Sequence, residues 1–291
     1  MLSMLEDLKG PIMNGLLLGG LYGVIGIGMS MIFGIVRLVN LAHGDLVILA
    51  SYLSFVAVSL LHVNPLFTLV VIIPAMFVIG FFVQYYLLNR VLAKGMESPL
   101  LVAFGLSIIL QNLLLLIFTP DARALFTSIS ITTLPIGSFL NVPLIYLVDF
   151  IASILTIFLL SAFFSRTYMG KAIRAASDDE GAAQLMGINT KTIYAWAMGL
   201  AAGTAGIAGV MVGMTFTFYP HTGGEYLIVA FGVVIIGGLG SMIGTFLGGL
   251  ILGLAQIVGA HFLGPGFQLL SGYMILLIVL TFKPTGLFSK G

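Results

Sequence analysis

Four stretches of this chain contain no Asp, Glu, Lys or Arg, and they restrict what it can fold into. They cover residues 10–36, 46–89, 192–224 and 226–282. Each is longer than the roughly 20 apolar residues that a helix needs to cross the hydrocarbon core of a bilayer. Charged residues make up only 7% of the 291 residues, whereas a soluble domain carries about a quarter. The sequence therefore predicts an integral membrane protein.

The apolar runs are unbroken, which indicates helices that span the membrane. Strands of a membrane barrel would instead be segments of about ten residues with alternating polarity. We predict an all-α, polytopic protein in which residues 1–291 form a single transmembrane domain with about seven to nine transmembrane helices. The expected spans are residues 11–36, 38–61, 66–89, 99–118, 143–164, 193–217, 228–257 and 267–282.

The stretch 228–257 allows two interpretations. It is either one span with a re-entrant piece or two short spans, and the pattern alone does not choose between them. Gly237, Gly238 and Gly240 lie in its middle. Glycine is where a membrane helix can unwind if neighbouring protein satisfies the backbone, so we expect the helix to break at these glycines.

Lys and Arg gather in three segments, which are residues 90–94, 165–192 and 283–290. Because short cytoplasmic loops hold the excess of basic residues, these segments are expected on the cytoplasmic side. The connection 119–141 contains a single Arg123, and the connections around His62 and His221 contain neither Lys nor Arg. These three are expected on the outer side, which puts the N-terminus outside and the tail inside and requires an odd number of crossings.

A shift of 180 residues aligns the chain with itself. The aligned positions are Gly19, Gly23, Gly26, Ile27, Met31, Gly44, Ile48 and Ala50 against Gly199, Gly203, Gly206, Ile207, Met211, Gly224, Ile228 and Ala230, and Asp45 aligns with Glu225. An odd number of expected crossings separates the copies, so residues 11–118 and 193–282 would form an inverted repeat, as in many transport folds. The alternative is chance, because a chain with 37 glycines produces accidental matches.

The expected cytoplasmic loop 165–192 contains a helix-start signal made of Ser177, Asp178, Asp179 and Glu180. Ser followed three residues later by Glu has the spacing of a capping box, and the two aspartates suit the positive end of a helix. Gly187 can end this helix in a left-handed conformation. We therefore predict a short helix over residues 178–186, with Ser177 as its N-cap.

A helix this short is marginal on its own and needs something to pack against. It would expose four apolar side chains on a loop that is otherwise charged, namely Ala182, Ala183, Leu185 and Met186. These side chains either pack on the inner ends of the protein's own spans or form a docking element for a cytoplasmic partner. The residues alone favour neither.

Three segments resemble one known family. The stretch RAASDDEGAAQLMGIN is similar to the cytoplasmic coupling loop of ABC importer permeases of the branched-chain amino acid type. The segment FGIVRLVNLAHGDLVILASY resembles that family's first-half motif, and the ending FKPTGLFSKG resembles its C-terminal signature. The match runs through essentially the whole chain. One departure is Gly181, which stands where the family usually has the Glu of Glu-Ala-Ala.

This resemblance implies a membrane-spanning permease subunit of an ATP-driven importer in the bacterial inner membrane. It implies four kinds of partner: a second homologous permease, two cytoplasmic ATP-binding subunits, a periplasmic solute-binding protein and membrane lipid. The chain contains no G-x-x-x-x-G-K-[ST], so it lacks the usual loop that cradles nucleotide phosphates. We expect no catalytic activity and no cofactor in this chain, with ATP and Mg²⁺ used by the ATP-binding partners. The net charge of +1 predicts no nucleic-acid partner.

Polar residues in or beside the expected spans are candidates for the translocation path or its gating. They are Asn40, His43, Asp45, Gln111, Asn112 and Glu225. Asp45 and Glu225 would each lie near a membrane surface, in the first turn of a helix where the dipole favours an acid. The amides could equally form ordinary interhelical hydrogen bonds. No metal site is predicted, because the remaining histidines lack a nearby carboxylate or a second histidine at ligand spacing.

Few charges along the expected route suit a zwitterionic or neutral solute, and the resemblance favours branched-chain or related amino acids. Two alternatives stay open. The first is another small neutral solute, such as urea or a short amide. The second is a secondary transporter with inverted repeats, which the 180-residue repeat favours and the expected lack of mid-span charges opposes. Uptake that depends on an ion gradient and not on ATP would identify the second.

Overall fold

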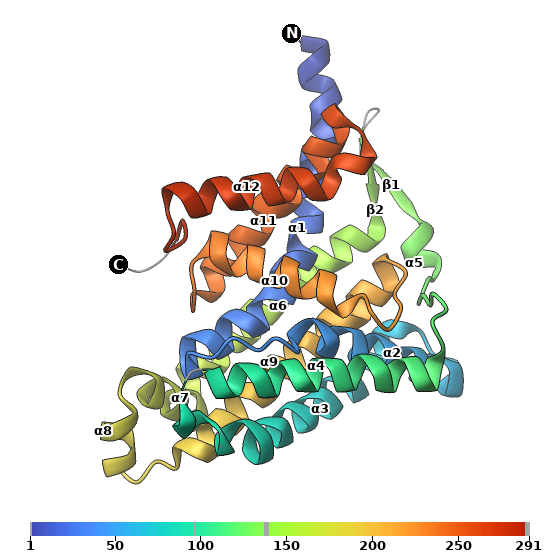
Figure 1. Ribbon diagram of the computed structural model, residues 1–291. Coiled ribbons are helices and arrows are strands. Elements are labelled where there is room, and N and C mark those ends of the chain that lie inside the picture. Colours follow the sequence, from blue (N-terminus) through green and yellow to red (C-terminus); the bar gives the residue numbers. More distant parts are fainter. Residues whose placement is uncertain (1, 96, 137–139, 289–291) are drawn as a thin grey trace.

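Apolar helices make up most of the computed structural model, which describes residues 2–95, 97–136 and 140–288 (Figure 1). In this part of the chain, eight helices are long and apolar enough to cross a membrane, and α10 (Gly223–Gly237) is a shorter apolar helix. The helices that supply the long spans are α1 (Leu2–Val36), α2 (His43–Leu61), α3 (Pro65–Phe82), α4 (Glu97–Phe118), α6 (Leu144–Arg166), α9 (Thr190–Thr215), α11 (Met242–Leu263) and α12 (Gln268–Phe282). The prediction of an all-α, polytopic membrane protein is confirmed.

Short turns extend two of these spans. A π-helical turn, η1 (Val83–Leu87), and a 3₁₀ turn, η2 (Leu88–Arg90), continue α3, and η3 (Leu92–Lys94) follows them. The 3₁₀ turn η4 (Pro265–Phe267) leads into α12. Lys290, in the predicted inner tail, lies outside the described residues.

The long connections 119–143 and 167–189 contain small elements, and they lie at opposite ends of the molecule (Figure 1). Between α4 and α6 lie α5 (Ser128–Ile131) and an antiparallel hairpin of β1 (Thr133–Ile136) and β2 (Leu140–Pro143), with Leu134 opposite Val142. Between α6 and α9 lie α7 (Tyr168–Asp178) and α8 (Glu180–Leu185). This separation agrees with the predicted outer and inner sides.

Helices α1 and α9 form the centre of the protein. In each of them 89% of the spanning window is buried, compared with 22% in α4 and 11% in the last span, which contains α12. Small residues make this central position possible, because they let helix backbones approach closely. A Cβ atom at Gly19 of α1 would lie only 2.5 Å from the Cα of Leu250 in α11. The apolar outer faces of the peripheral helices fit contact with lipid or with another membrane chain.

The stretch 228–257 folds as parts of two helices. Helix α10 ends at Gly237, and Gly238 and Gly240 have positive φ values of 100° and 81°, which glycine adopts at little cost. Helix α11 then starts after its N-cap Ser241, whose side chain accepts a hydrogen bond from Gly244 N at 3.1 Å. The predicted break at these glycines is confirmed. The stretch supplies one helix of spanning length, α11, and part of the shorter apolar helix α10.

The second span starts later than predicted. We expected it from residue 38, but residues 37–42 lie outside any helix and α2 begins at His43. Arg37 ends α1 with a left-handed φ of 56°, and the side chain of Asn40 accepts a hydrogen bond from Ala42 N at 3.1 Å. Such local side-chain bonds compete with helix formation.

Helices α2 and α10 begin 180 residues apart, at His43 and Gly223. Each follows a non-helical segment, 37–42 after α1 and 216–222 after α9. These positions fit the predicted offset between the two halves of the chain. The inverted repeat itself stays a prediction.

Candidate functional site

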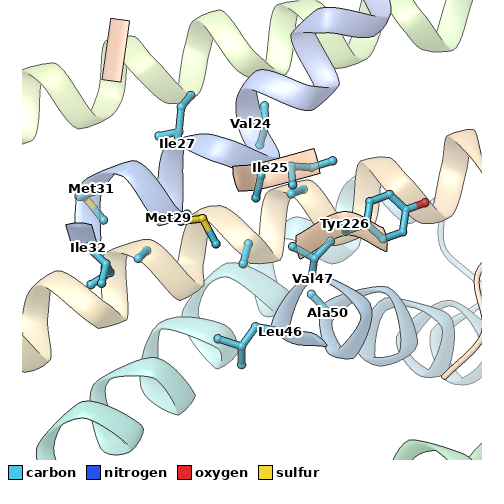
Figure 2. Close-up of a cluster of buried hydrophobic side chains, with 14 of the residues drawn as sticks. Val24, Ile25, Ile27, Met29, Met31, Ile32, Leu46, Val47, Ala50 and Tyr226 are labelled. Atoms are coloured by element: carbon cyan, nitrogen blue, oxygen red, sulfur yellow. The ribbon is translucent and has the colours of Figure 1, made fainter. Parts of the chain in front are cut away.

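The first turns of α2 and α10 meet inside the protein. A Cβ atom added to Gly44 would overlap the carbonyl oxygen of Gly223, so the absence of a side chain allows this approach. Ile25 of α1, Val47 of α2 and Tyr226 of α10 belong to the buried cluster beside this junction (Figure 2). The junction therefore lies in the protein interior.

The two helices reach this junction from opposite ends of the molecule. Near the end of α1, Gly34 O accepts a hydrogen bond from Ser177 Oγ of the inner loop at 2.7 Å. Just after α9, Phe218 forms a β-bridge with Arg123 of the outer segment. Because α2 and α10 start only a few residues after these ends and still touch, their starts lie within the thickness of the membrane. Our expectation that Asp45 and Glu225 lie near a membrane surface is therefore wrong.

Asp45 is the buried acidic group of this junction, with 2% of its surface exposed. Ser107 Oγ donates to its Oδ2, and Gln111 Nε2 donates to its Oδ1 at 3.0 Å. Both donors are on α4. Among the described residues, Asp45 forms no ion pair, so neutral donors and the positive end of α2 offset its charge. The carboxylate thus joins α2 to α4 by hydrogen bonds and lies against Gly223 of α10.

The structure brings Asp45 and Gln111 together and places two other candidates on exposed faces nearby. Glu225, in the first turn of α10, is exposed and accepts a long hydrogen bond from Tyr219 OH at 3.5 Å. Asn112 is also exposed, and its Nδ2 donates to the carbonyl of Ile108 in its own helix at 2.8 Å.

The remaining two candidates are buried against α1 and α9. His43 Nε2 lies 2.8 Å from the carbonyl oxygen of Ile25, which joins the start of α2 to α1. Asn40 Nδ2 lies 3.9 Å from Sδ of Met198 in α9. Both side chains hold the non-helical segment before α2 in place.

Two residues of this region were missed in the sequence. Ser107 lies four residues before Gln111 on α4, so the helical spacing could have placed both on one face. Asp149 is fully buried in α6, where its Oδ2 accepts a hydrogen bond from Thr215 Oγ1 at 2.9 Å, and its Oδ1 has no hydrogen-bond partner among the residues that the structure describes. It is the single acidic residue inside the expected span 143–164, and that was the signal for it. The expectation that mid-span charges are missing is therefore wrong at Asp149.

The inner loop differs from the prediction at its start. Ser177 and Asp178 belong to the end of α7, and the N-cap of α8 is Asp179, whose Oδ1 accepts a hydrogen bond from Ala182 N at 2.9 Å. The prediction that Ser177 caps a helix over 178–186 is wrong. Ala172, Ile173 and Ala176 are buried against the protein and extend α7 through this point, and the Ser177 hydroxyl bonds Gly34 instead.

The apolar side chains of α8 divide between the protein and solvent. Ala183 is 4% exposed, so the prediction that it is exposed is wrong. Leu185 and Met186 are 91% and 83% exposed. Gly187 has a φ of 83°, which confirms its left-handed conformation, and Ile188 N donates to Ala183 O at 3.0 Å to close the helix. Glu180 and Gly181 lie on the exposed side of α8.

Known proteins resemble this chain over nearly its whole length. The family described as branched-chain amino acid transport system / permease component matches residues 12–280. The high-affinity branched-chain amino acid transport system permease protein BraD of Pseudomonas aeruginosa is 32% identical, over 96% of this chain and 95% of that protein. The corresponding LivH of Escherichia coli K12 is 32% identical, over 95% and 94%.

A more distant relative is the permease protein LivM of Escherichia coli K12, which is 26% identical over 49% of this chain and 33% of that protein. No solved structure matches the chain significantly. The relatives are transport permeases and not enzymes. From the family match and these two near-complete alignments, the chain belongs to the family of branched-chain amino acid transport system permease components.

Proposed function

We propose that this chain is a permease subunit of an ATP-driven ABC importer in the bacterial inner membrane, which takes up branched-chain amino acids delivered by a periplasmic binding protein. The observation that carries the proposal is the exposed apolar end of α8, formed by Leu185 and Met186. Helices α7 and α8 stand at one end of the molecule, away from the hairpin (Figure 1). The family match and the names of the relatives support the solute.

Helix α8 has the construction of a docking element. It is six residues long, so it is too short to be stable alone. Asp179 caps its start and Gly187 closes its end, while Ala183 anchors it on the protein. Exposed apolar side chains on an otherwise charged loop fit a groove of a partner protein. We propose two cytoplasmic ATP-binding subunits as these partners; they would use ATP and Mg²⁺, which this chain would not bind.

The junction of α2 and α10 supports a transport path for a zwitterion. The amide groups at the start of both helices place partial positive charge inside the membrane, where it can attract a carboxylate. Asp45 lies beside these amides with Gln111 and Ser107, and Glu225 lies on the exposed face of α10. We propose that a second homologous permease covers this face and completes the path, which the likeness to LivM supports.

The test is co-purification from gently solubilised native membranes. The tagged chain is compared with a variant that carries Leu185→Asp and Met186→Asp. We expect wild type to bring down an ATP-binding subunit and a second permease, and the variant to lose the ATP-binding subunit alone. The matched control is Ile131→Asp, which changes a side chain of α5 that is 78% exposed on the other end of the molecule. It should retain both partners.

Transport by the reconstituted complex distinguishes the alternatives. We expect uptake of leucine that requires ATP and the binding protein. Uptake by the chain alone, driven by an ion gradient, would replace this proposal with a secondary transporter. Competition by excess urea or acetamide that equals competition by valine would replace the amino acid with a small neutral solute.

A further inference from the structure

A cavity of about 630 Å³, open to solvent on one side, lies at the inner end of the protein, separate from the Asp45 junction. Its walls come from the end of α1, the connection around Leu92, the start of α4, helix α8 and the start of α9. This volume is within the range of about 300–1,000 Å³ that is typical of small-molecule sites. The cavity therefore has the size and the position to bind a small cytoplasmic solute.

Charges of both signs line this cavity. They are Arg37 after α1, Lys191 at the start of α9 and Glu180 at the start of α8. In the described part of the chain, none of these three side chains forms an ion pair. The positive charges of Arg37 and Lys191 and the negative charge of Glu180 are therefore not paired with each other.

Hydrogen bonds hold the elements that carry these charges. Gln184 Nε2 donates to Glu180 Oε1 at 3.2 Å and to Thr190 Oγ1 at 3.0 Å. Asn89 Nδ2 donates to the carbonyl oxygen of Lys191 at 2.9 Å. Arg37 has a φ of 56°, a conformation that a residue with a side chain adopts only when its surroundings impose it. The charged groups are thus carried by a fixed frame.

The rest of the lining is largely apolar and includes Phe33, Leu92 and Leu100. A carboxylate pairs well with a guanidinium, and an ammonium group pairs with a carboxylate. We propose that this cavity binds an amino acid with an apolar side chain, its carboxylate on Arg37 and Lys191, its ammonium on Glu180 and its side chain against Phe33, Leu92 and Leu100.

Occupancy of this site would regulate transport. Glu180 and Gln184 belong to α8, whereas Arg37 follows α1, so a bound amino acid joins α8 to the transmembrane bundle. If α8 couples the permease to the ATP-binding subunits, a ligand that holds α8 in one position slows uptake. The amino acid that accumulates inside then limits its own import. This regulation rests on the proposed function, whereas binding to the cavity does not.

The first test measures binding directly. Radiolabelled L-leucine is equilibrated with the tagged chain, purified together with the membrane subunits that accompany it, in the absence of the periplasmic binding protein. Since Arg37→Gln removes a charge-assisted hydrogen bond, we expect it to weaken this binding about tenfold or more. Arg37→Lys should retain part of the affinity. The control Arg90→Gln removes a nearby exposed charge that does not line the cavity, and it should bind as wild type does. Equal binding by wild type and Arg37→Gln would overturn the site.

The second test measures regulation in proteoliposomes with ATP and increasing unlabelled leucine inside and the binding protein outside. The initial rate of labelled uptake should fall as internal leucine rises in wild type, and Arg37→Gln should need about tenfold more internal leucine for the same fall. Internal 4-methylpentanoate and leucinamide, which each lack one of the two charges, should not inhibit. Inhibition by these analogues or unchanged sensitivity of Arg37→Gln would overturn the regulation. Lack of ATP-dependent uptake without internal leucine would instead overturn the proposed function.

Discussion

The buried carboxylate of Asp45 accepts its hydrogen bonds from neutral side chains. Its two oxygens accept hydrogen bonds from Ser107 and Gln111 of α4. A buried charge without such donors is costly in the membrane. The hydrogen bonds of the Asp45 carboxylate therefore depend on the position of α4 relative to α2. A movement of either helix would change them.

Replacing Gln111 should impair uptake, while replacing its neighbour should not. Gln111→Leu removes the donor to Asp45 Oδ1, and hydrogen bonds to charged groups contribute about 1.5–3 kcal/mol. We expect the initial rate of leucine uptake to fall roughly tenfold. Asn112→Leu serves as the matched control, because Asn112 bonds its own helix and is exposed. Equal loss of uptake in both variants, at equal amounts of protein in the membrane, would contradict this role of Gln111.

The residues of the site could be predicted only in part. Asp45 and Gln111 stood out because polar side chains are rare in apolar spans. Ser107 did not stand out by its residue type, since serine in a membrane helix usually bonds its own backbone. Its spacing of four residues from Gln111 was the signal that was missed. Ser177 was misplaced because a capping box is a local pattern, and the burial of Ile173 and Ala176 against the spans decided where α7 ends.

At the scale of elements, α8 depends on one cap. Asp179 Oδ1 accepts the hydrogen bond from Ala182 N, and removing an N-cap costs about 1 kcal/mol. We expect Asp179→Ala to unfold much of this six-residue helix and to reduce leucine-stimulated ATP hydrolysis by the complex several-fold. Asp178→Ala removes the same charge from an exposed position outside α8 and should leave hydrolysis near the wild-type rate. A larger loss in Asp178→Ala than in Asp179→Ala would count against the cap.

The crossing of α1 and α11 depends on glycines. Gly19→Ala would place a Cβ atom 2.5 Å from the Cα of Leu250, so the helices must separate. Such overpacking typically costs about 1–3 kcal/mol, and we expect a lower midpoint of thermal unfolding in detergent. Gly105→Ala in α4 meets no atom within 4 Å and should keep or raise the midpoint, because alanine favours a helix. Unchanged stability of Gly19→Ala would show that the crossing can adjust.

The presence of each spanning helix was easier to predict from the sequence than the residues at which it begins and ends. Long charge-free runs indicate spans because a helix needs about 20 mostly apolar residues to cross the hydrocarbon core. The start of α2 was placed too early because residues 38–42 are as apolar as a helix would be. Their conformation depends on the hydrogen bond to Asn40 and on the left-handed conformation of Arg37. A hydropathy profile shows neither of these.

At the scale of the whole molecule, the two loop regions should face opposite compartments. The chain has no cysteine, so a single introduced thiol can be labelled without background. We expect Ile131→Cys to react with an impermeant maleimide in intact spheroplasts and Tyr168→Cys, in α7 and outside the proposed docking surface, to react only after the membrane is opened. Both side chains are highly exposed, so access and not burial controls labelling. The reverse pattern would invert the topology.

The arrangement of the spans could be predicted from the sequence only in part. The basic loops correctly separated the two ends of the molecule, and the shift of 180 residues pointed at Gly44 and Gly224 as equivalent positions. The meeting of Gly44 with Gly223 was not predictable, because the contact of two helix starts inside a membrane depends on how α1 and α9 pack.

The meeting of α2 with α10 has a consequence for biosynthesis. Asp45 and Gly223 are 178 residues apart (223 minus 45). At about 5–20 residues per second, synthesis needs roughly 10–35 s to deliver α10 after α2 has entered the membrane. Throughout this interval the amides and the carboxylate at the start of α2 lack part of their final cover. During that time the polar groups at the start of α2 need cover from the insertion machinery or from water, because unsatisfied polar groups are costly inside a membrane.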